Sequence, residues 1–168
     1  MNTLKLKISG CPKGQATVLV DNQKFKAKRN NYGNIEGTFQ TEKSSVEISI
    51  YKYLEINGKL WVFMSLIFFV ISLFGILEPR YDKHCIVYAY KVKVDLNETS
   101  EVKLALNGYS NNGRAFEIST ECKTQELTNI YYVDNKAKKR LKIMKIVKLF
   151  MWIGLVAGCI VAIAKILG

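Results

Sequence analysis

The chain has 168 residues, of which 49% are hydrophobic, and it carries a formal net charge of +11. A surplus of this sign suits contact with anionic lipid headgroups or another polyanion. Nucleic-acid binding is disfavoured because no recognition helix or RNP-type aromatic strand accompanies the charge. A zinc site and other cofactors are not expected, because the four cysteines form no CxxC and His84 has only Cys85 beside it.

Residues 1–59 predict a small β unit. Short segments alternate apolar and polar residues with period two, and no window before residue 59 shows a helical period. The expected strands are "LKLKI" (4–8), "ATVLV" (16–20), "GTFQT" (37–41) and "SVEISIYKYLEI" (45–56). The first ten residues are alternating and charged, so no signal peptide is expected.

Two apolar runs predict transmembrane helices. Leu60–Leu77 has 18 residues without a charge, and Leu149–Ala164 has 16. As helices they would be roughly 27 Å and 24 Å long, near the ~30 Å thickness of the hydrocarbon core. We therefore assign residues 60–78 and 144–168 to two transmembrane helices, with Trp61 and Trp152 at the headgroup level.

Residues 79–143 predict a second small β unit with the layout of the first. "YKVKV" (90–94) matches "LKLKI" without a gap at a shift of 86 residues, and the same shift sets "VKLAL" (102–106) on "ATVLV". "AFEIST" (115–120) and "ELTNIYYV" (126–133) follow in the same order. Chance similarity between small β units is the alternative, but the agreement over strand, turn and strand favours a diverged duplication. The fold class expected is a membrane-anchored, mainly β protein with two sandwich-like units, each followed by one helix.

"PKGQATVLVDN" (12–22) followed by "GTFQTEKSSVEISIYKY" (37–53) resembles the PEGA-type small immunoglobulin-like sandwich. The residues that carry the resemblance are Pro12, Val18, Val20, Asp21 and Tyr53. The PEGA tetrapeptide is missing, "TEKSS" occupies the place of the usual glycine turn, and the second unit matches less well. The resemblance implies a non-catalytic accessory module at a cell envelope.

No catalytic motif occurs in the sequence. A thiol of Cys85 activated by His84 is the one enzymatic alternative, and it is disfavoured because adjacent strand residues point to opposite faces. Whether Cys85 and Cys122 form a disulfide is left open. Asn97-Glu98-Thr99 fits the N-glycosylation pattern, which matters only in a eukaryotic lumenal domain.

The second helix carries the candidate membrane site. Basic residues that precede it are expected at the headgroup interface, namely Lys138, Lys139, Arg140, Lys142, Lys145 and Lys148. Gly154 and Gly158 form a GxxxG pair that could pack against the first helix or a second copy. The positive-inside rule favours a cytoplasmic second unit, but the basic residues 1–59 would then have to cross the membrane without a signal. The opposite orientation keeps residues 1–59 inside but leaves the seven basic residues before the second helix outside. A shallow or re-entrant helix that keeps both units inside is the third arrangement, so the orientation stays open.

The function expected from these features is that of a non-enzymatic integral membrane protein, a scaffold or accessory interaction subunit of the bacterial cytoplasmic membrane. Its partners would be membrane lipid and either another protein or further copies of itself. The alternative is a module that binds envelope glycan or anionic lipid through the basic loops 22–34 and 107–114. An enzyme that uses His84 and Cys85 is the third and least favoured class.

Overall fold

The computed structural model describes residues 1–11, 16–29, 34–73, 84–109 and 113–167. The chain divides into two units. A β unit contains Met1–Tyr53 and Ile86–Val133, and a helical unit contains Leu54–Cys85 and Asp134–Gly168.

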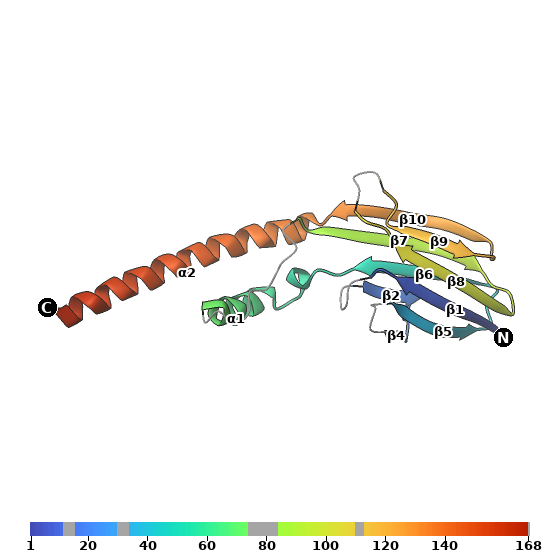
Figure 1. Cartoon of the computed structure of the whole chain (residues 1–168), viewed down its shortest axis with the longest axis horizontal. Coiled ribbons are helices and arrows are strands. Elements are labelled where there is room, and N and C mark those ends of the chain that lie inside the picture. Colours follow the sequence, from blue (N-terminus) through green and yellow to red (C-terminus); the bar gives the residue numbers. More distant parts are fainter. Residues whose placement is uncertain (12–15, 30–33, 74–83, 110–112, 168) are drawn as a thin grey trace. The chain divides into compact units, whose positions relative to one another are not determined.

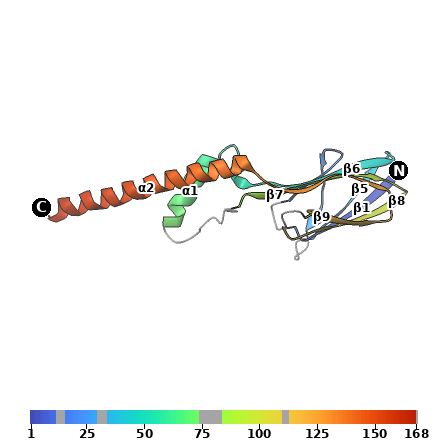
Figure 2. The same ribbon diagram turned by 90° about the horizontal axis from the view of Figure 1, so that it is seen from above.

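Two five-stranded sheets make up the β unit (Figure 1). The first has the spatial order β4 (Lys28–Arg29), β5 (Ile35–Thr41), β1 (Asn2–Ser9), β8 (Thr99–Leu106) and β9 (Phe116–Thr120). The second has the order β10 (Thr124–Val133), β7 (Ile86–Asp95), β6 (Ser45–Lys52), β2 (Ala16–Val20) and β3 (Gln23–Lys24). In Figure 2, β6 and β7 lie in one layer and β1, β8 and β9 lie in the other.

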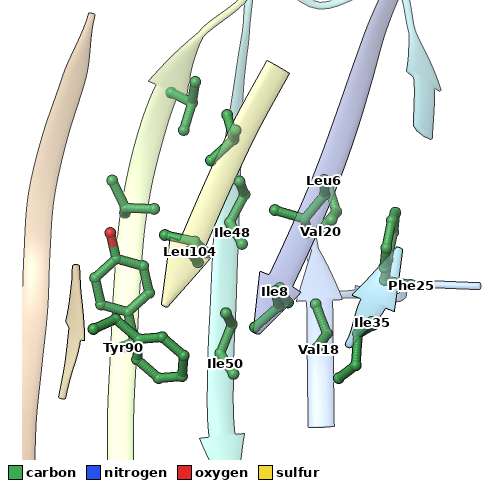
Figure 3. Close-up of a cluster of buried hydrophobic side chains, with 14 of the residues drawn as sticks. Leu6, Ile8, Val18, Val20, Phe25, Ile35, Ile48, Ile50, Tyr90 and Leu104 are labelled. Carbon is green, nitrogen blue, oxygen red and sulfur yellow. The ribbon is translucent and has the colours of Figure 1, made fainter. Parts of the chain in front are cut away.

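Alternation of apolar and polar side chains explains why these segments form strands. In β1, Leu4, Leu6 and Ile8 are buried, whereas Lys5 and Lys7 point to solvent. The apolar faces of both sheets meet in one core, shown in Figure 3, which includes Leu6, Ile8, Val18, Val20, Ile48, Ile50, Tyr90 and Leu104. Each such side chain contributes roughly 1.5–3 kcal/mol through burial.

The structure differs from the expectation of two separate sandwiches, because both halves of the chain contribute strands to both sheets. β1 runs parallel to β8 with Leu6 opposite Val102, and β6 runs antiparallel to β7 with Ile48 opposite Val92. The physical reason is size, since a unit of 59 residues buries too little surface to be more than marginally stable. Shared sheets give one larger core in place of two small ones.

The strand pairing does not reproduce the proposed sequence repeat. Within the first half, β1 pairs with β5 and β2 pairs with β6. The shift of 86 residues sets β1 on β7 and β2 on β8, yet β7 pairs with β10 and β8 pairs with β9. In the first half, with strands β1, β2, β5 and β6, the first strand therefore pairs with the third. In the second half, with strands β7, β8, β9 and β10, the first strand pairs with the fourth. The structure thus does not show a duplication.

The helical unit contains a short turn and two helices. They are the 3₁₀ turn η1 (Glu55–Asn57), α1 (Trp61–Leu73) and α2 (Asn135–Leu167). In the part of the chain that the structure describes, only α2 is long and apolar enough to cross a membrane. α1 has 13 residues, and residues 74–78 of the predicted first span lie outside the described residues. The prediction of a mainly β chain with a C-terminal helix able to span a membrane is confirmed; two spans are not shown.

Candidate membrane-anchoring site

α2 begins nine residues before the expected boundary at residue 144, because Asp134 caps it. The Asp134 Oδ1 atom accepts a hydrogen bond of 3.0 Å from the backbone N–H of Ala137, which satisfies one of the free donors of the first turn. Ala137, Leu141 and Met144 follow at spacings of four and three residues and are buried. The residues 135–143 that were expected in the second β unit are therefore helical.

Arg140 joins the start of α1 to the start of α2. Its Nη1 atom donates hydrogen bonds to the carbonyl oxygens of Ile56 at 2.9 Å and of Gly58 at 3.3 Å. Its guanidinium carbon lies 5.2 Å from the centre of the Trp61 ring, within the range of a cation–π contact. A lysine would keep the charge but not the planar guanidinium that lies over the Trp61 ring while donating to both carbonyls.

A second contact closes the same junction. Asn57 Nδ2 donates to Asp134 Oδ2, and the backbone N–H of Asp134 donates to the carbonyl of Cys85 at 2.9 Å. We call Asn57, Trp61, Asp134 and Arg140 the collar. The collar fixes both ends of the 57–85 segment to the first turns of α2.

Beyond the collar, the first turns of α1 pack against α2. Trp61, Val62, Ser65 and Leu66 of α1 and Ile143, Met144, Val147, Lys148 and Met151 of α2 line a small apolar cavity of about 40 Å³. Because Trp61 lies beside Arg140, the start of α1 is level with the first turns of α2, about two turns before Lys148, the last basic residue before the apolar run.

Basic side chains occupy a flank of α2 over the same turns. Lys138, Lys142 and Lys145 are exposed and recur at spacings of four and three residues, each about 100° around the helix from the buried residue before it, Ala137, Leu141 or Met144. Lys139 is also exposed, whereas Arg140 lies in the collar and Lys148 is half-buried beside α1. Of the six basic residues predicted for the interface, the structure thus brings two to α1 and leaves four on the helix surface.

The C-terminal half of α2 is apolar and exposed on all sides. Trp152 is 51% exposed, and none of the most apolar 18-residue window is buried. Gly154 and Gly158 face open space, since a Cβ added at either would meet no atom within 4 Å in the described structure. The glycine pair is therefore not used against α1, and its use against a second copy stays a prediction.

The tyrosines before the helices divide between core and surface. Tyr131 packs against the core, its ring lies edge-on to Tyr88 at 6.1 Å, and its hydroxyl donates to the carbonyl of Asn107. The neighbouring Tyr132 points to the outer face, as do Tyr51 and Ile130, while Tyr53 lies just past the end of β6. Tyr51, Tyr53, Ile130 and Tyr132 are 38–50% exposed. We call these four the outer-face patch.

Of the basic loops predicted to bind a ligand, 22–34 and 107–114, residues 30–33 and 110–112 lie outside the described residues. Residues 24–28 cross β5, and Lys24, Lys26 and Lys28 line an open groove with Glu36 and Thr38. Gly37 permits the crossing, because a Cβ there would lie 2.8 Å from Phe25 Cζ. Residues 107–109 follow β8, two strands away from β5. The two loops are therefore separated by the end of β1.

The thiol of the predicted His84–Cys85 pair lies in the interior. Cys85 is buried at 2% exposure, and its backbone carbonyl accepts a hydrogen bond from the N–H of Asp134 in the collar. A free thiol is found at Cys122. Among the described residues, no group of three or more His, Cys, Asp or Glu side chains is placed to hold a metal ion.

Together these features define a β-sandwich protein with a capped C-terminal helix of membrane-spanning length. Comparisons with protein families, with curated proteins and with solved structures find no match to this chain. The functional conclusion therefore depends on the physical features of the chain itself.

Proposed function

We propose that the protein is a non-enzymatic integral membrane scaffold or accessory subunit of the bacterial cytoplasmic membrane, in which α2 anchors the β unit. The exposed apolar half of α2 supports this role, because about 16 apolar residues in water would be strongly unfavourable and in lipid are not. The basic turns before it suit anionic headgroups. The resemblance to PEGA-type modules supports an accessory role at an envelope.

The outer-face patch is the main support for a role in binding another protein. The register sets Tyr51 opposite Ala89 and Ala89 opposite Ile130, so these three residues form one row across β6, β7 and β10. Tyr132 lies two residues further along β10. Neighbouring strands are about 4.8 Å apart, so Tyr51 and Ile130 are separated by roughly 10 Å. Exposed aromatic and aliphatic side chains gathered on one sheet face are typical of a protein interface.

β10 adds an edge to this face. It is ten residues long and pairs only with β7 in the described structure, and its bulge between Glu126 and Thr128 is confined to its first half. The side chain of Asn129 in β10 is hydrogen-bonded to β9. Its amide nitrogen donates to the carbonyl of Phe116, and its amide oxygen accepts from the backbone N–H of Phe116. Ile130, Tyr132 and Val133 are left with exposed side chains at this edge, which is a common site for a protein partner.

The test places a photo-crosslinking amino acid at Ile130 in the full chain, expressed in its membrane and extracted in detergent. A matched control carries the same group at Gln125, which is exposed on the same strand. We expect a discrete cross-linked product, with a protein or a second copy, from position 130 and not from 125, and we expect Tyr132→Lys in the same patch to abolish it. A monomeric chain that gives no product at 130 would refute the scaffold role.

Binding of anionic lipid or glycan is the second candidate, and the groove beside Gly37 favours it. Three lysine side chains line it against one carboxylate, which leaves a net positive surface. The full chain in nanodiscs of zwitterionic lipid should then float with added anionic liposomes at low salt, and Lys24→Glu with Lys26→Glu should remove this flotation. Flotation of the double variant equal to that of the wild type would exclude the groove as the site.

A further inference from the structure

We infer that α1 enters the membrane that α2 crosses and that the chain then returns to the side from which it came, so that every strand lies on one side. The inference begins with sheet pairing. β6 and β7 are neighbours with a continuous antiparallel register from Ser45–Asp95 to Tyr51–Ala89. The segment between them therefore leaves and re-enters the β unit at one end of the sheet. Figure 1 shows the arrowheads of β6 and β10 at this same end.

A single complete crossing by this segment is incompatible with the sheets. It would place β1, β5 and β6 on one side of the bilayer and β7, β8 and β10 on the other. The ladders β1–β8 and β6–β7 would then be broken, and both supply buried residues to the one core. A hydrophobic slab about 30 Å thick cannot separate strands that are about 4.8 Å apart.

Two complete crossings are excluded by length. Each crossing helix needs about 20 apolar residues, and the uncharged run from Leu60 to Leu77 has 18 in all. α1 itself has 13 residues, so it is roughly 20 Å long, about two-thirds of the hydrocarbon thickness. The segment can enter the bilayer but cannot pass through it and back.

Lipid is the occupant that suits the surface of α1. Val62, Phe63, Met64 and Ile67 are exposed, and consecutive exposed positions show that the apolar surface surrounds the helix instead of forming one stripe. A helix lying flat at the interface needs a polar face, and α1 has none. Its one described polar side chain, Ser65, donates to the Trp61 carbonyl at 2.6 Å and so needs no water.

The level of α1 beside α2 supports the same conclusion. Trp61 lies beside Arg140, and Trp61 and Val62 line one cavity with Met144 and Lys148, so α1 begins level with the turns of α2 that contain its basic residues. Trp61 lies under the Arg140 guanidinium, as expected for a ring at the headgroup level. From this level α2 continues across the bilayer, whereas α1 ends part of the way through.

Three glycosylation acceptors in the full chain, translated into microsomes, test on which side of the membrane each part of the chain lies. One is the chain's own Asn97-Glu98-Thr99, with Asn97 exposed after β7, and short extensions supply one at each terminus. We expect modification of the C-terminal acceptor alone, with the N-terminal acceptor and Asn97 behaving alike. Different results at the N-terminus and Asn97, or the same result at all three, would overturn the inference. A version with a cleavable signal peptide is the positive control, which should show that Asn97 can be modified. Thr99→Ala should remove the glycosylated band of that version.

Depth within the bilayer separates an entering helix from one lying flat. Phe63 and Val70 are seven residues apart, so they lie on one face of α1, and both are exposed. Nitroxide labels at Phe63→Cys and Val70→Cys, with Cys122 and Cys159 replaced by Ser, report depth through collisions with oxygen and a water-soluble quencher. We expect the label at 70 to lie about 10 Å deeper than the label at 63. Equal depths, or water exposure of both, would refute the inference while leaving the proposed scaffold role standing.

Discussion

Removing the hydroxyl of Tyr90 should stabilise the β unit, although tyrosine is a native core residue. Tyr90 is 1% exposed, its ring packs 5.1 Å from that of Phe116, and its hydroxyl has no hydrogen-bond partner in the described structure. Figure 3 shows this hydroxyl among apolar side chains. An unpaired buried hydroxyl costs about 1–3 kcal/mol, and phenylalanine fills the same space. We therefore expect Tyr90→Phe to raise the free energy of unfolding by about 1 kcal/mol at pH 7.

The effect should grow in alkali. Burial, with a smaller contribution from the Glu126 carboxylate against the opposing Arg114, raises the pKa of Tyr90 to about 12. An unfolded tyrosine titrates near 10, so between pH 10 and 12 the unfolded chain loses a proton that the folded chain keeps. Stability therefore falls as pH rises through this window, by about 1.4 kcal/mol per pH unit. Tyr90→Phe removes this share of the loss.

The assay is thermal or urea unfolding of the full chain in detergent, followed by the circular dichroism of the strands. Tyr131→Phe is the matched control. It makes the same chemical change but removes a hydroxyl that donates to Asn107, so it should destabilise by about 1 kcal/mol. If Tyr90→Phe destabilises as much as Tyr131→Phe, the Tyr90 hydroxyl has a partner and the reasoning is refuted.

Three other substitutions test separate features of the chain. Gly37→Ala should cost about 1–3 kcal/mol by displacing Phe25, measured by the same unfolding assay; an unchanged midpoint would mean that the crossing segment moves freely. Arg140→Lys keeps the charge but loses the donor fork and ring contact, so hydrogen exchange of residues 56–61 should accelerate several-fold, and unchanged exchange would refute the collar. Asp21 is partly buried, which tends to raise its pKa, but hydrogen bonds from Lys43 and a backbone N–H lower it overall. Its stabilisation is therefore present at neutral pH and lost as pH falls through the folded pKa. The gap between wild type and Asp21→Asn, under 1 kcal/mol for a surface pair, should narrow as pH falls below the ordinary aspartate pKa and close below the lowered pKa of the folded state.

Local pattern in the sequence identified most of the strands. The segment at 16–20 coincides with β2, and those at 4–8 and 90–94 lie inside β1 and β7. Period-two alternation reports which face of a strand is apolar, and nothing more. It carries no information on whether β6 pairs with a strand of its own half or with β7, because that choice depends on contacts across the whole chain.

The start of α2 was missed for a different reason. Residues 135–143 are dominated by lysine and arginine, which hid the apolar spacing of Ala137, Leu141 and Met144. Asp134 before that spacing is a capping signal that could have moved the boundary. The collar itself could not be found this way, because its backbone acceptors lie about 80 residues from Arg140 along the chain.

The distribution of the basic residues conflicts with the positive-inside rule only if α1 crosses the membrane. In a two-span arrangement, the ten Lys and Arg residues of 1–59 and the twelve of 79–143 lie on opposite sides, so either choice of orientation moves many charges to the wrong side. With α1 re-entrant, all 25 Lys and Arg residues except Lys165 lie on the side of the β unit. The positive-inside rule would then favour a cytoplasmic β unit, with only the end of α2 moved across the bilayer. Adding four lysines after Leu167 should therefore reduce insertion of α2, measured by modification of the C-terminal acceptor, whereas four lysines before Met1 should not. Equal effects of the two additions would show that α2 alone does not set the topology.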